Sequence, residues 1–219
     1  MAFRSSSLLA GAGTNGAAVP VPTGATNLDI AVVGLYIEDT ITITPPLGFT
    51  LKADLRTSAT LRGGLVVYWK RLTGADSGTY SFTWTGTPWR GANCGLWSGR
   101  ATSGDPFDGT VGTAESTVGV TTLNVSTSPA GSNGDAVGFW TSFNGGTSFT
   151  PPTNYTERAD NSDVMCLDSR DAVTSGSTGS ISATATITDF MKAFLGVLAV
   201  AGASAVKNPS TVSQYAGFY

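Results

Sequence analysis

The chain contains an internal repeat, and this feature constrains its fold more than any other. Residues 44–54 read TPPLGFTLKAD, and residues 150–160, which lie 106 positions later, read TPPTNYTERAD. The segments that begin at Asp29 and Asp135 match at the same spacing of 106 positions. A long pattern that recurs at one spacing is typical of a duplicated structural unit. The sequence therefore predicts two halves that are built from the same series of strands.

Each half is predicted to form five strands, of which the fourth has the clearest pattern. In the first half Tyr80, Phe82 and Trp84 alternate with Ser and Thr, which is typical of a strand with one wet face. At a spacing of 101 positions the second half has Ala183 and Ala185 in place of Phe82 and Trp84. Because bulky side chains need space opposite them, we expect these two pairs to face each other in one shared core. The predicted strands are 29–37, 49–54, 63–70, 80–84 and 92–98, with copies at 135–143, 155–160, 163–168, 181–187 and 193–200.

Composition agrees with a β fold, because Thr, Val and aromatic residues take the place of Lys, Glu and Leu. We predict an all-β protein, an antiparallel two-sheet β-sandwich of jelly-roll type made from duplicated halves at about residues 29–99 and 135–200. Residues 13–204 would form a single sandwich domain. Residues 1–12 and 205–219 would form an N-terminal and a C-terminal arm.

The charge pattern argues against two classes of partner. Only 12% of residues are charged, the formal net charge is −3, and Lys and Arg are scattered singly. Nucleic-acid binding needs clustered cations, and membrane-surface binding needs a polybasic segment, so neither partner is expected. The apolar run from Ala193 to Val206 is too short to span a bilayer and is predicted to include a buried strand. No secretory signal is recognised at the N-terminus.

The residues that usually carry chemistry are scarce. The chain has no histidine, which excludes Ser-His-Asp and Cys-His catalytic pairs and His-ligated metal sites. We expect no enzyme activity, no cofactor and no metal. The acidic segments 160–163 and 168–171 are interpreted as solvated loops, with a calcium site as the alternative. Cys94 and Cys166 are expected to be buried free thiols, although one disulfide stays open.

Exposed tryptophan could provide a platform for a sugar. Trp89, Trp97 and Trp140 are the candidates, but Trp84 and Trp97 lie among apolar neighbours and are expected in the core. Trp89 and its neighbour Arg90 follow Pro88 in a predicted loop. They are therefore the predicted glycan contact.

Several short motifs occur in an order that resembles a known group of proteins. The motifs are Asp29-Ile-Ala-Val-Val, Pro45-Pro-Leu-Gly-Phe-Thr, Val67-Tyr-Trp-Lys, Ser77-Gly-Thr-Tyr-Ser-Phe-Thr-Trp, Gly95-Leu-Trp-Ser-Gly, Asp105-Pro-Phe-Asp and Pro151-Pro-Thr-Asn-Tyr-Thr-Glu-Arg. Over about residues 13–203 the chain is similar to a concanavalin-like or jelly-roll sandwich module of tailed-bacteriophage virion surface proteins. Phe49 and Phe107 depart from that pattern, which has Trp and Ile there. The resemblance implies tail, tail-fibre or capsid-surface proteins without catalytic residues.

The resemblance and the two arms together suggest a function. We expect a non-enzymatic virion structural protein, a capsid decoration, minor capsid or minor tail protein that is made in the host cytoplasm and acts on the virion surface. It would form homo-oligomers and bind other virion proteins. The alternative is an adhesin of a tail or head fibre that binds a host surface glycan. Arm residues predicted to contact neighbouring subunits are Phe3, Arg4, Tyr215, Phe218 and Tyr219; in the alternative reading, each arm lies along its own sandwich.

Overall fold

The computed structural model describes residues 3–9, 15–38, 40–56, 63–131 and 133–202. These residues form an all-β structure with antiparallel pairing, as predicted. Fifteen strands occur in the described part of the chain. They are β1 (Phe3–Leu9), β2 (Gly16–Pro20), β3 (Ile30–Ile37), β4 (Thr50–Asp54), β5 (Leu65–Arg71), β6 (Thr79–Thr83), β7 (Arg90–Trp97), β8 (Gly112–Glu115), β9 (Val120–Val125), β10 (Gly134–Ser142), β11 (Phe149–Thr150), β12 (Thr156–Asp160), β13 (Met165–Val173), β14 (Ile181–Asp189) and β15 (Met191–Leu198).

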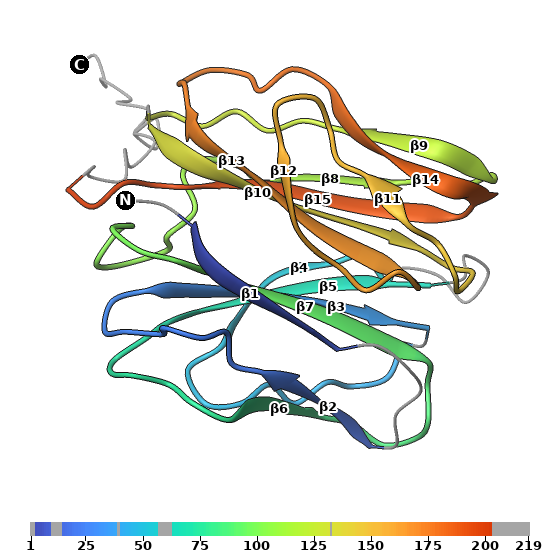
Figure 1. Cartoon of the computed structure of the whole chain (residues 1–219), viewed down its shortest axis with the longest axis horizontal. Coiled ribbons are helices and arrows are strands. Elements are labelled where there is room, and N and C mark those ends of the chain that lie inside the picture. The colour runs from blue at the N-terminus through green and yellow to red at the C-terminus, as the bar shows by residue number, and fades with distance from the viewer. Residues whose placement is uncertain (1–2, 10–14, 39, 57–62, 132, 203–219) are drawn as a thin grey trace, which may run out of the picture.

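The strands form four sheets that are stacked as four layers (Figure 1). The two middle layers are five-stranded, with the orders β1-β7-β3-β5-β4 and β12-β13-β10-β15-β8. A two-stranded sheet, β2-β6, covers the outer face of the first, and a three-stranded sheet, β11-β14-β9, covers the outer face of the second. Strands β1–β7, called the first half below, therefore form one sandwich, and strands β8–β15, the second half, form another.

Three hydrophobic cores fill the spaces between the four layers. The first core lies inside the first half and includes Val33, Tyr68 and Phe82. The third core lies inside the second half and includes Trp140 and Ala183. The second core joins the halves and is built from the opposing faces of the two five-stranded sheets. Because the central strands β3 and β10 each lie between two cores, all of their residues are buried.

The two five-stranded sheets have matching strand orders. Read from β1 and from β8, the orders β1-β7-β3-β5-β4 and β8-β15-β10-β13-β12 place the strands of the two predicted copies at corresponding positions. The edge strands match in detail, because β4 has a bulge between Leu51 and Ala53 and β12 has one between Glu157 and Ala159. These correspondences are what the predicted repeat requires. A common origin of the halves stays a prediction, and a jelly-roll connectivity is not confirmed.

One detail of the predicted packing is wrong. Phe82 and Trp84 belong to the first core, whereas Ala183 and Ala185 belong to the third, at the opposite end of the stack. The reason is that β6 and β14 lie in the outer sheets, so each points its apolar face at the five-stranded sheet of its own half. The halves do pack face to face, but through their five-stranded sheets.

The junction between the halves resembles the interface of a two-fold symmetric dimer. β7 packs against β13 while β5 packs against β15, so corresponding strands lie on opposite sides of the centre. At the centre the Phe139 ring lies over Gly34, where a Cβ atom would come within 2.5 Å of the ring. The Tyr36 hydroxyl donates to the carbonyl of Phe143 at 3.1 Å, so a polar contact also joins the halves.

Two cation–π contacts lie at corresponding places on either side of this junction. The bulge of β4 carries Lys52, whose ammonium lies 4.9 Å from the centre of the Phe107 ring. The bulge of β12 carries Arg158, whose guanidinium lies 4.2 Å from the centre of the Phe3 ring. A bulge redirects a side chain out of the regular alternation. Here each bulge directs a cation to an aromatic ring outside its own half, which is Phe3 of the first half for Arg158 and Phe107 of the connecting segment for Lys52.

The complementary pair Gly34 and Phe139 provides a test of the junction. Gly34→Val should destabilise the protein by about 1–3 kcal/mol, because the added side chain has no space under the Phe139 ring. Phe139→Ala should cost about 3–5 kcal/mol through the cavity that it leaves. In the double variant the valine can occupy part of that cavity, so the loss should be smaller than the sum of the two single losses when measured by urea denaturation. Additive losses would contradict the packing described here.

Candidate functional site

The predicted assembly contacts at the N-terminus lie within the fold of the chain. Phe3 and Arg4 belong to β1, which pairs with β7 at the edge of the first five-stranded sheet. The Phe3 ring packs edge-on against Trp97, with ring centres 5.5 Å apart, and the Arg4 Nε lies 3.0 Å from the carboxylate of Asp29. This placement corresponds to the alternative in which the arm lies along its own sandwich. The other three predicted contacts, Tyr215, Phe218 and Tyr219, lie outside the described residues.

Trp89 is exposed as predicted, but the structure does not bring it together with Arg90. The Trp89 side chain is 37% exposed, whereas Trp97 and Trp140 are fully buried and cannot contribute to a sugar platform. Arg90 begins β7 on the face that continues with Ala92 of the first core, and Trp89 precedes it. Successive residues of a strand point to opposite faces, so the two side chains diverge. Burial without a counter-charge lowers the pKa of Arg90.

The acidic segments do not form a metal site in the described residues. Asp160 accepts hydrogen bonds from the backbone amides of Ser162 and Phe149, and Asp163 accepts one from Gly146. Among the described residues, no group of three or more Cys, Asp or Glu is arranged to hold a metal ion. Asp160 and Asp163 therefore order their own loops, which gives the calcium alternative no support. The interpretation of 168–171 as a solvated loop is wrong, because these residues lie in strand β13 and Asp168 is fully buried.

The two cysteines are free and buried, as predicted. Cys94 belongs to the first core and Cys166 to the third, so the second core lies between them and a disulfide within the chain is excluded by geometry. Burial raises the pKa of both thiols well above its usual value. Neither is poised as a nucleophile at neutral pH.

The three glutamates of the chain are spread over the fold. Glu38 follows β3, Glu115 ends β8 and Glu157 lies on the edge strand β12. Glu115 forms an ion pair with the buried ammonium of Lys192. Glu157 is exposed and lies opposite Asp168.

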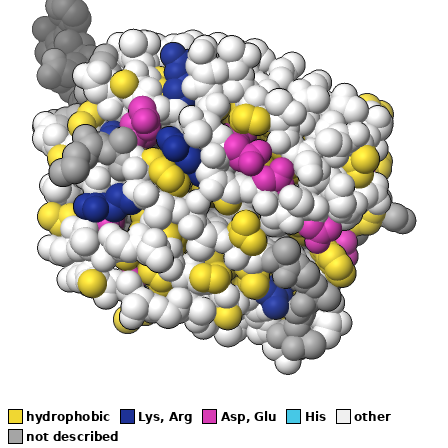
Figure 2. Space-filling model, in the orientation of Figure 1, with side chains coloured by type: hydrophobic (Ala, Val, Ile, Leu, Met, Phe, Trp, Pro, Cys, Tyr) yellow, Lys and Arg dark blue, Asp and Glu magenta, His cyan; other side chains and the backbone are white. Residues whose placement is uncertain are grey.

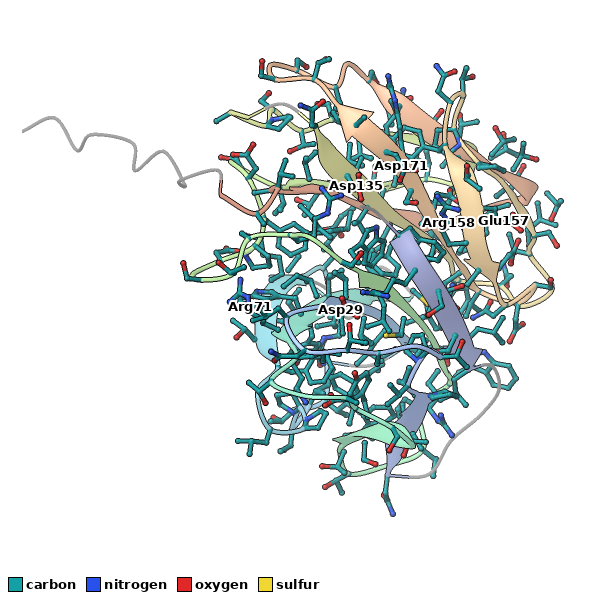
Figure 3. All side chains as sticks on the ribbon, turned by 60° about the vertical axis from the view of Figure 1, so that its left-hand side comes forward. Asp29, Arg71, Asp135, Glu157, Arg158 and Asp171 are labelled. Carbon is teal, nitrogen blue, oxygen red and sulfur yellow. The ribbon has the colours of Figure 1, made fainter. Side chains whose placement is uncertain are left out.

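A buried ion pair fixes the connection between the halves. The segment 98–111 connects the two halves. Arg71 of the first half donates hydrogen bonds to two carbonyls of this segment, those of Ala101 and Gly104. Within the same segment, the Arg100 Nη2 lies 2.8 Å from Asp135 Oδ2 of the second half, and both side chains are almost fully buried. The two groups form an ion pair, but the contact does not have the geometry of a hydrogen bond. Burial lowers the pKa of Arg100 and raises that of Asp135. Figure 3 shows Asp135 with Asp171, whose charge adds to the effect on Asp135.

Asp168 is the most unusual acid in the described part of the chain, and the sequence analysis places it in a solvated loop rather than in a core. It lies on β13, is fully buried, and its Oδ1 has no hydrogen-bond partner. Its Oδ2 accepts only a long contact of 3.7 Å from the Cys166 thiol. Burial, with a smaller contribution from the charge of Glu157, raises the pKa of Asp168 to about 8. No pattern in the sequence separates it from Asp171, which lies on the same strand and is exposed.

The surface carries few charges. On the face shown in Figure 2, Lys and Arg side chains are few, most side chains are uncharged, and some of the cations lie next to Asp or Glu. No protein family, curated protein or solved structure matches this chain.

In the described part of the chain, no helix has the length and apolar character to cross a membrane.

The Arg100–Asp135 pair gives a test of how the halves are joined. Arg100→Met should cost about 3–5 kcal/mol, because it leaves the carboxyl of Asp135 buried without its cation. Arg4→Met is the matched control: the Arg4 side chain is 35% exposed, and Asp29 keeps the amide and hydroxyl of Thr26 as donors. That change should cost about 1 kcal/mol or less. Urea denaturation of the two variants measures the difference, and equal losses would be inconsistent with a structural role for the buried pair.

Proposed function

We propose that the protein is a non-enzymatic structural component of a bacteriophage particle, on the outside of the capsid or the tail, and that it acts through contacts between subunits. The motif resemblance over residues 13–203 supports the particle type. The observation that carries the structural role is the four-layer body, in which three continuous cores leave two outer sheets as opposite faces.

The outer sheets favour docking through uncharged surfaces. β6 exposes Thr79, Ser81 and Thr83 on its outer face, and β14 exposes Thr184 and Thr186. Seven ion pairs join charged side chains within the described residues, among them Lys52–Asp105 and Lys70–Asp76. Hydroxyl-rich faces carry little desolvation cost in comparison with ionised side chains, so they suit a protein that packs beside copies of itself or beside other virion proteins.

The proposal is tested on particles produced by the genome that encodes the chain. Mass spectrometry of purified particles should detect the protein, and immunogold labelling should place it on their outside. Absence from the particles would rule out the proposal.

A deletion tests the predicted role of the C-terminal arm. Removal of residues 208–219 should abolish particle association, while the circular dichroism spectrum and the melting temperature of the purified protein stay unchanged. These residues are not among those that the structure describes, and none of the described cores includes them. Re-addition of the full-length protein is the control. Full occupancy of particles by the truncated protein would show that the arm is not needed for docking.

The second candidate function is binding of a host surface glycan, which the exposed Trp89 favours. Trp89 is the only one of the four tryptophans Trp84, Trp89, Trp97 and Trp140 that is substantially exposed. Trp89→Ala should abolish binding on a glycan array, because a sugar face stacks on the indole ring. Arg90→Ala should have little effect, since its side chain points to the other face of the sheet. Absence of any binding by the unaltered protein would leave this candidate without support.

A further inference from the structure

The carboxyl of Asp168 is buried beside the edge strand β12, at the place where this strand pairs with β13. β12 pairs only with β13, and Glu157 of β12 lies directly opposite Asp168. The neighbouring strand on the other side, β10, presents Gly138 opposite Asp168 and so offers no side-chain donor. The titratable and charged side chains near Asp168 are Cys166 and Arg170 on β13, Glu157 and Asp160 on β12, and Tyr155 just before β12.

The first half provides an internal comparison for this arrangement. At the corresponding place, directly before the bulge of β4, Leu51 lies opposite Tyr68. Tyr68 packs into the first core against the Phe82 ring, with ring centres 5.3 Å apart. The second half therefore has two carboxyl groups where the first half has the uncharged pair Leu51 and Tyr68. A neutral carboxyl group can be buried at such a site at a modest cost in free energy. A carboxylate anion that is buried there without hydrogen-bond donors costs much more.

Release of β12 would also affect the N-terminal strand. Arg158 of β12 lies over the Phe3 ring and donates to Ser169 Oγ at 2.8 Å, while the Ser6 hydroxyl donates to the Arg158 carbonyl. β12 thus holds β1 from the side of the second half. When β12 leaves the sheet, β1 keeps only its pairing with β7 and its contacts within the first half.

We propose that Asp168 is a proton-operated latch: its protonated form holds the edge strand β12 on the sheet, and loss of the proton opens β12 and loosens the N-terminal strand β1. In the open strand Asp168 is hydrated and ionises as an ordinary aspartate. The free energy of the closed form relative to the open form is therefore most favourable below pH about 4. It becomes less favourable as the pH rises towards about 8, and it no longer changes above that pH. This proposal does not depend on the function proposed above.

The two cysteines of the chain allow the opening to be measured. Cys166 lies beside Asp168 in the third core, and Cys94 lies in the first core as an internal reference. The full-length protein is treated briefly with iodoacetamide between pH about 5 and 9, and alkylation of each cysteine is quantified by peptide mass spectrometry. We expect the labelling of Cys166 relative to Cys94 to increase by up to about tenfold per pH unit up to pH about 8 and then to level off.

Three variants separate the latch from a general loosening of the fold. In Asp168→Asn the labelling ratio should not change with pH. In Asp189→Asn, the matched control, the increase should persist, because Asp189 is also buried but accepts hydrogen bonds from Ser142 and Asn144. In Glu157→Gln, which changes an exposed residue, the increase should be smaller and should level off at lower pH.

A constant labelling ratio in the unaltered protein, or an equal increase in Asp168→Asn, would overturn the proposal. If Asp168→Asn fails to fold, Glu157→Gln decides the question, since an unchanged increase in that variant would also overturn it.

Discussion

The burial of β3 and β10 on both faces is the constraint on which the rest of the structure depends. Each of these strands lies at the centre of a five-stranded sheet, with an outer sheet on one side and the other half on the opposite side. Neither five-stranded sheet could face water on its inner side, because that side carries residues such as Val67, Trp97 and Phe194. The two sandwiches therefore depend on each other, although each has a core of its own.

Polar groups in the second core fix how the halves sit on each other. Asn93 is fully buried on β7, and its amide donates to the carbonyls of Ala159 and Met165 in the second half. The hydroxyl of Tyr36 reaches the carbonyl of Phe143. Apolar contacts alone permit sliding of one sheet over another, whereas each of these donors loses its partner if the sheets shift. The polar contacts thus add specificity to a junction whose free energy comes mainly from apolar burial.

The sequence predicts the strands better than it predicts the layers. The continuous apolar runs at 29–37 and 135–143 identify strands buried on both faces, and the alternation at 80–84 identifies a strand with one wet face. The pattern of a single strand does not say which sheet covers it, so Phe82 was assigned to the wrong core. A sequence pattern likewise does not distinguish the buried Asp168 from the neighbouring exposed Asp171, because exposure depends on the strand that packs beside each.

The junction also explains how two matching halves come to differ. By strand pairing, Gly34 and Phe139 occupy corresponding places, which shifts the match of these two strands by one residue from the spacing of 106 positions seen in the sequence. Gly34 lies beside Val67, which lies opposite Ala53, and Phe139 lies beside Leu167, which lies opposite Ala159. These two residues also contact each other across the centre of the junction. In a dimer of identical chains, a residue on the symmetry axis meets its own copy, so two glycines would leave a void and two phenylalanines would clash. Within a single chain the two positions can change independently, which permits the complementary pair of one glycine and one phenylalanine. If the halves arose by duplication, the joining of the copies is what made this close central packing accessible.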